Sequence, residues 1–241
     1  MMIIRRLIYL FVIFPVLIIG CSFVRGSGVV ITDTREVSGF NRVELDSIGE
    51  LTIIQGESES LTIEAESNIA RRVITDVSSG TLSIEFTGGT LGDVIPTEPI
   101  LYELTMRDIS GINLSGAGRI YSASIATSSL DLDVSGIGDV IIDNLIADRV
   151  DVDLTGAGTI DLAGTIEEQH VNLSSVGNYS AGGLESKRAE IALSGAGTAT
   201  LWAVEGLDVV ISGVGTVDYY GDPVVSQDIS GVGRLNHLEN P

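Results

Sequence analysis

The chain has 241 residues, of which 44% are hydrophobic, 5% aromatic and 19% charged, as is typical of a globular protein rather than a disordered or polytopic membrane protein. Its 33 acidic and 13 basic residues give a formal net charge of −20. Because such a surface repels phosphate, the charge excludes nucleic-acid binding and disfavours docking on anionic lipid through a basic patch.

Residues 1–20 have the pattern of a secretory signal peptide. Arg5 and Arg6 precede an apolar run from Leu7 to Gly20. This run matches the hydrophobic part of a signal peptide and is shorter than the roughly 20 residues that a membrane-spanning helix needs. We therefore expect export and cleavage, and an uncleaved anchor is the alternative.

The apolar run ends in Ile18-Ile19-Gly20 before Cys21, the single cysteine of the chain. This ending resembles the lipobox of bacterial lipoproteins, although Ile18 stands where leucine is usual. The resemblance implies that Cys21 is acylated and anchors the mature protein to a membrane of the cell envelope. Ser22 stands where lipoproteins kept in the inner membrane usually have Asp, which favours the outer membrane or cell surface.

The next segments are expected to be a tether and a β-rich cap. Residues 21–39 would form the lipidated cysteine and a short polar tether, and residues 40–106 an N-terminal β segment. Short runs with alternating apolar residues are typical of strands and lie at 43–45, 51–54, 61–64 and 82–86. We expect this less regular segment to cover one end of the structure that follows.

Residues 107–238 are a repeat. A tetrapeptide of the form [ST]-[GS]-x-G recurs every 18–20 residues, beginning at Ser115, Ser135, Thr155, Ser174, Ser194, Ser212 and Ser230. The positions one and three residues before it are almost always apolar, and the position between them is mainly polar. This period of two predicts a strand with one buried face in each repeat, followed by a glycine turn and a second strand.

The repeat length distinguishes two β architectures. A propeller blade needs about 40–45 residues, so one repeat is too short. We therefore predict an all-β fold, a parallel β-helix (a solenoid) with about seven coils of 18–20 residues. A right-handed coil is favoured, although the repeat alone is compatible with either hand.

The run Gly111-Ile-Asn-Leu-Ser-Gly-Ala-Gly118 and its later echoes also resemble a known bacterial family. It is the family described as putative autotransporter adhesin, head GIN domain, and the resemblance covers about Phe40 to Leu238. The resemblance implies a β-helical, exported or lipid-anchored protein with a role in adhesion and no established catalytic residues.

Aligned repeats place acidic residues in columns. Asp133 and Asp153 lie two residues before the tetrapeptides, and Asp131 and Asp151 lie four residues before them. Stacked like charges indicate either a solvated acidic face or a site for a hard cation such as Ca²⁺. His170 falls between Asp151 and Glu190 and would relieve charge repulsion or, alternatively, serve a polysaccharide-cleaving enzyme.

Trp202 and Tyr220 occupy equivalent outward positions of consecutive repeats, and Tyr219 should point inward. Two exposed rings on neighbouring coils would form a platform for a sugar or another subunit. The alternative is that they only cover the C-terminal end of the coil.

The sequence thus favours a non-catalytic exported lipoprotein that acts as a surface binding or adhesion module without a cofactor. Its partners would be the membrane and a glycan or protein ligand, and self-association is an open alternative. The competing hypotheses are a carbohydrate-active enzyme that uses His170 and a purely structural envelope protein.

Overall fold

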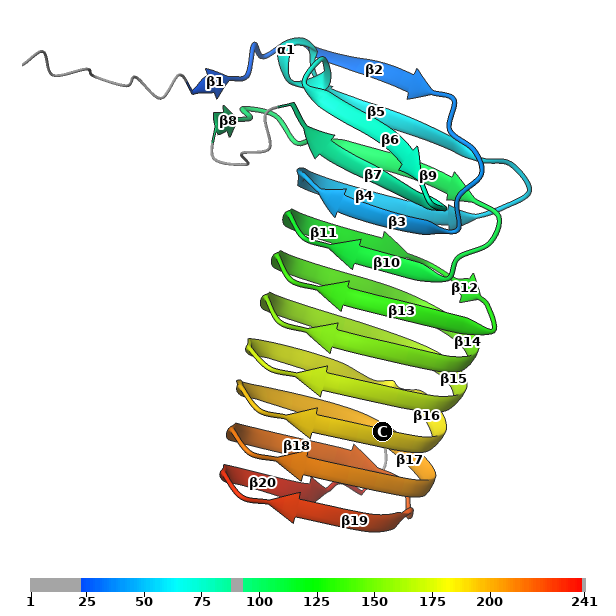
Figure 1. Ribbon diagram of the computed structural model, residues 1–241, viewed down its shortest axis with the longest axis vertical. Coiled ribbons are helices and arrows are strands. Elements are labelled where there is room, and N and C mark those ends of the chain that lie inside the picture. The colour runs from blue at the N-terminus through cyan, green and yellow to red at the C-terminus, as the bar shows by residue number, and fades with distance from the viewer. Residues whose placement is uncertain (1–22, 88–92, 240–241) are drawn as a thin grey trace, which may run out of the picture.

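The computed structural model describes residues 23–87 and 93–239, and the predicted signal peptide and Cys21 lie outside them. Stacked coils run along the long axis of the molecule, with a layered N-terminal segment at one end (Figure 1). This arrangement confirms the predicted all-β parallel β-helix. In the described ranges no helix has the length and apolar character needed to cross a membrane.

The coils are built from strands that pair in parallel with the strands of the next coil. Most coils consist of one long strand that bends around the core and ends at a glycine turn. The strands are β10 (Gly111–Leu114), β11 (Ala117–Ser122), β12 (Ile125–Ala126), β13 (Ser129–Val134), β14 (Ile137–Leu154), β15 (Ala157–Leu173), β16 (Val176–Leu193), β17 (Ala196–Ile211), β18 (Val214–Tyr220), β19 (Val224–Ile229) and β20 (Val232–His237).

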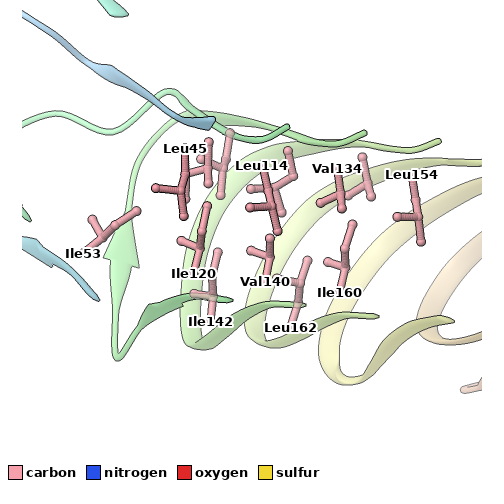
Figure 2. Packing of buried hydrophobic residues seen from close by; sticks show 14 of the residues in the cluster. Leu45, Ile53, Leu114, Ile120, Val134, Val140, Ile142, Leu154, Ile160 and Leu162 are labelled. Carbon is pink, nitrogen blue, oxygen red and sulfur yellow. The ribbon is translucent and has the colours of Figure 1, made fainter. Parts of the chain in front are cut away.

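The core consists of apolar columns that run through the coils. Leu114, Val134 and Leu154 are in register on successive coils and are fully buried. Figure 2 shows this row facing a second row that contains Ile120 and Val140. The alternation read from the sequence therefore gives the correct inward face.

The glycine turn requires coils to approach closely. The N–H of Gly136 donates to the carbonyl oxygen of Leu114 (2.9 Å), and an added Cβ at Gly136 would overlap the carbonyl oxygen of Gly116. Ser175 occupies this position in one turn, where its side-chain hydroxyl donates a hydrogen bond to the Leu154 carbonyl oxygen (3.2 Å). The turn therefore favours glycine, because the neighbouring coil leaves little room for a side chain.

The N-terminal segment contributes the first coil as well as the cap. Its elements are β1 (Val24–Arg25), β2 (Val30–Arg35), β3 (Arg42–Asp46), β4 (Ile48–Gln55), β5 (Ser60–Glu66), α1 (Ser67–Ala70), β6 (Val73–Ser78), β7 (Thr81–Phe86), β8 (Val94–Ile95) and β9 (Leu101–Met106). β3 and β4 pair in parallel with β10 and β11. Beyond them the pairing is antiparallel. β6 pairs with β7, and β5 pairs with β9 and β2, which ends the parallel stack.

Part of the expected tether is folded. β1 pairs with β8, and β2 pairs with β5, so residues 24–25 and 30–35 belong to the cap. The buried carboxylate of Glu66 holds these segments together, because it accepts hydrogen bonds from the N–H groups of Gly28 (2.5 Å) and Thr97 (2.8 Å) and the Thr97 hydroxyl (2.6 Å). These bonds, led by the one from the Thr97 hydroxyl, lower the pKa of Glu66 to about 2 against the opposing effect of burial.

At the opposite end of the stack, the residues that the structure describes form no comparable cover. Apolar side chains of the last coil are partly exposed, with Val225 at 36% and Ile229 at 38%. Tyr219, whose inward direction agrees with the prediction, packs against the core and stacks on His237 at 4.8 Å between ring centroids. This stacked pair covers part of the final core layer.

Two neighbouring residues test the inward and outward assignment. Leu154→Asp should lower the free energy of unfolding by more than about 3 kcal/mol, because it places an unpaired charge in a fully buried position. Asp153→Asn should change it by less than about 0.5 kcal/mol, because Asp153 is exposed and faces Asp133 on the next coil. Chemical denaturation of both variants measures the difference, and equal effects would contradict the register.

Candidate functional site

Two columns of outward side chains run along the face formed by the strands before the glycine turns. The register places Asp131, Asp151, His170, Glu190 and Asp208 in one column, the acidic column. It places Asp133, Asp153, Asn172, Ala192 and Val210 in the second column, two residues further along each strand. The four predicted aspartates therefore lie together on neighbouring coils.

Between the two columns, over β14 to β17, lies an open groove of about 300 Å³. The acidic column forms one wall from Asp151 to Asp208. The other wall begins with Asp153 and Asn172 and ends with Ala192 and Val210, so it changes from polar to apolar. The groove therefore crosses four coils and has walls of different chemistry.

Arginines of the same chain balance two of the predicted aspartates. Arg42 Nη1 lies 2.8 Å from Asp131 Oδ2, and Arg149 contacts both carboxylate oxygens of Asp151 at 2.5 and 2.6 Å. The hydrogen bonds from Arg149 lower the pKa of Asp151. In the described ranges no three His, Cys, Asp or Glu side chains form a group that could hold a metal ion.

The other two aspartates face each other without an arginine between them. Partial burial and then the neighbouring charge of Asp153 raise the pKa of Asp133. Asn172 donates a hydrogen bond from Nδ2 to Asp153 Oδ1 (2.9 Å). The repulsion between the two carboxylates thus remains in the folded protein and is only partly offset by the amide.

His170 lies in the wall of the groove, between the carboxylates of Asp151 and Glu190. Its Nε2 is 3.1 Å from Glu190 Oε2, whereas its Nδ1 is 4.0 Å from Asp151 Oδ1, which is too long for a hydrogen bond. The Nδ1 atom is buried and has no hydrogen-bond partner in the described part of the protein. His170 therefore contacts Glu190 directly and leaves one ring nitrogen unsatisfied.

The predicted aromatic platform lies outside the groove, on β17 and β18, and is less exposed than expected. Trp202 and Tyr220 pair in register on β17 and β18, but both side chains are half-buried. The Tyr220 ring extends over Gly182, where an added Cβ would lie 2.9 Å from its Cε2 atom. Both rings are therefore only partly exposed, and Gly182 gives Tyr220 a surface to pack on.

A buried polar network fixes the backbone of Trp202. Ser186 donates a hydrogen bond from its hydroxyl to the Trp202 carbonyl oxygen (2.7 Å), and Gln169 Nε2 donates to the Ser186 hydroxyl (2.8 Å). The Tyr179 hydroxyl donates to Gln169 Oε1 (3.0 Å). This network satisfies polar groups at the point where the register between β16 and β17 shifts.

Sequence reasoning missed part of the groove and its arginines. Asp208 and Val210 lie four and two residues before Ser212, so the same repeat alignment could have found them. Arg149 lies on the same outward face, two residues before Asp151. Arg42 carries no such signal, because it belongs to the first coil, where the tetrapeptide is absent.

The pairing of Arg149 with Asp151 can be tested by titration. Arg149→Gln should raise the pKa of Asp151 toward its ordinary value, as measured by nuclear magnetic resonance. Because the folded state lowers this pKa, the stabilisation is present above the unfolded value of about 3.9 and is lost as pH falls through the folded value. The variant should lose about 0.2–1 kcal/mol at pH 7 and nothing where Asp151 is protonated in both states.

The matched control for this titration is Arg119→Gln. It removes a surface pair with Asp139 at 3.6 Å and should leave the pKa of Asp151 unchanged. An unchanged pKa of Asp151 in the Arg149 variant would contradict the assigned pairing.

Several solved structures have a similar fold over most of this chain. A putative adhesin from Bacteroides fragilis NCTC 9343 is 26% identical, with 89% of this chain and all of that chain covered and a TM-score of 0.85. A putative lipid binding protein from Parabacteroides distasonis ATCC 8503 is 20% identical, with 89% and 99% covered and a TM-score of 0.71. A putative adhesin from Parabacteroides merdae ATCC 43184 is 20% identical, with 90% and 99% covered and a TM-score of 0.66.

No curated protein matches the sequence. A family model, described as putative auto-transporter adhesin, head GIN domain, matches residues 39–223. This range contains the groove, all the glycine turns but the last, and most of the cap. The chain therefore belongs to the head GIN domain family of putative auto-transporter adhesins.

Proposed function

We propose that the protein is a non-catalytic lipoprotein of the cell envelope that acts as an adhesion module and binds its ligand in the groove beside the acidic column. The observation that carries this proposal is the groove itself, which crosses four coils and presents carboxylates along one wall. Membership of an adhesin-like family supports the same conclusion. Cys21 supplies the anchor, toward the outer membrane or the cell surface.

The charges of the groove favour a basic polypeptide segment as ligand. Glu190 and Asp208 are in register on neighbouring coils, and in the described ranges no arginine or lysine lies within ion-pair distance of either. A lysine or arginine of a ligand would relieve this repulsion. Its aliphatic stem would pack on Val210, which is 48% exposed on the opposite wall.

Binding to a lysine-rich peptide tests this proposal. Glu190→Gln combined with Asp208→Asn should raise the dissociation constant by about two- to thirtyfold, since each exposed charge pair contributes about 0.2–1 kcal/mol. Raising the salt concentration should weaken binding to the unmodified protein more than binding to the double variant, which retains Asp151 and Asp153 in the groove. Isothermal titration calorimetry with the mature protein measures both effects.

The controls separate this proposal from its competitors. Trp202→Ala combined with Tyr220→Ala should leave peptide binding unchanged, and glycan-array binding that these changes abolish would favour the aromatic platform. The contact of His170 with Glu190 favours the enzyme hypothesis as second candidate. Polysaccharide cleavage that disappears in His170→Ala would establish that hypothesis. If the protein binds no ligand in any of these assays, the result would favour a structural role.

The anchor requires its own test. Cys21→Ser should leave an uncleaved precursor or release the protein from the membrane fraction, because a serine cannot form the thioether to the lipid. Fractionation of cells followed by intact mass measurement detects either outcome. A Cys21→Ser protein that matures and stays in the membrane fraction would contradict the lipoprotein proposal.

A further inference from the structure

The N-terminal end of the molecule exposes apolar side chains that the fold does not use. Phe23 and Val29 are each 60% exposed, and Ile95 is 48% exposed. Phe23 directly precedes β1, Ile95 lies in β8, and Val29 directly precedes β2; these strands are all at the capped end of the stack (Figure 1). Val30 and Ile31 continue the exposed apolar run at 41% and 37%.

Hydrogen bonds hold these side chains in one surface. Arg25 pairs with Ile95, and extending the alternation of β1 by one residue places Phe23 on the same side as Arg25, away from the buried Val94. Glu66 binds the N–H groups of Gly28 and Thr97, so the loop before Val29 and the loop after Ile95 share one anchor point. The surface is therefore a fixed part of the cap.

The same end carries arginines that are free of acidic partners. Arg25 and Arg71 are exposed and form no ion pair within the ranges that the structure describes. Asn68 Nδ2 donates to the Arg25 carbonyl oxygen (2.8 Å), which keeps α1 and the following Arg71 beside β1. Glu98 is an exposed acid in the adjoining loop. Two arginines thus lie beside the apolar side chains, together with the acids Asp93 and Glu98.

We propose that this surface, the N-terminal tip (Phe23, Arg25, Val29, Arg71 and Ile95), rests in the interface of the membrane to which the protein is anchored. The proposal depends on the acylation of Cys21 proposed above. Two residues, Ser22 and Phe23, separate Cys21 from Val24 in β1, and three Cα–Cα steps span at most about 11 Å, so the lipidated residue would lie within that distance of the strand. The apolar side chains enter the boundary between headgroups and acyl chains, and the two guanidinium groups bind lipid phosphates.

The length of this connection explains why the membrane is the partner. A long tether would leave the cap free, whereas two residues between Cys21 and β1 and the pairing of β1 with β8 bring the cap to the bilayer surface. Once the acyl chains are inserted, contact of the tip with the bilayer becomes an intramolecular event with a high effective concentration. Weak apolar and electrostatic contacts then suffice to hold it.

Depth-dependent quenching tests the proposal. The acylated mature protein would be reconstituted into vesicles of phosphatidylethanolamine and phosphatidylglycerol with brominated acyl chains. An environment-sensitive fluorophore would be attached to Val29→Cys in the tip or to Val232→Cys in the last coil. Both valines are exposed, at 60% and 77%, so they are a matched pair. Quenching at position 29 should exceed that at position 232 by at least about threefold.

Variants of the tip sharpen the result. Phe23→Ser combined with Ile95→Ser should reduce quenching at position 29 to the level of position 232, while circular dichroism and the fraction of vesicle-bound protein stay unchanged. Equal quenching at the two positions in protein with a verified lipid would overturn the tip proposal alone. An intact mass without lipid on Cys21 would overturn the anchor first and the tip proposal with it.

Discussion

The stack depends on the close approach of backbones at the glycine turn. There, the N–H groups of one coil reach the carbonyl oxygens of the coil before it, and an added Cβ at Gly136 or Gly156 would overlap that backbone. This contact fixes the register of the following strand, and the register decides which side chains enter the core. The apolar columns and the outward columns both follow from it.

Periodic features could be predicted from the sequence, and features that break the period could not. The columns of Leu154 and of Asp151 follow directly from the repeat. The first coil cannot be recognised from the repeat pattern, because its turn has Asp46-Ser47-Ile48-Gly49 where later coils have Ser or Thr followed by glycine or serine. The antiparallel pairing of β2 with β5 depends on contacts that no local pattern encodes.

The same distinction applies to the candidate site. Alignment of repeats places His170 beside Glu190, yet it does not reveal that Arg149 turns toward Asp151 on its own strand. It also does not reveal that Tyr220 packs over Gly182, since that contact depends on an irregularity in β16. Side-chain choices among several neighbours of similar charge or shape are decided by packing, which a single sequence does not specify.

The direction of the ladder hydrogen bonds has a mechanical consequence. Strands run across the long axis, so the bonds between coils point along it (Figure 1). A ligand held in the groove and a membrane held at the opposite end would therefore stretch these bonds lengthwise. All bonds between two coils would share the load, and rupture would separate whole coils. Tensile strength would then be set by the weakest junction between coils, a property that single-molecule force spectroscopy can measure.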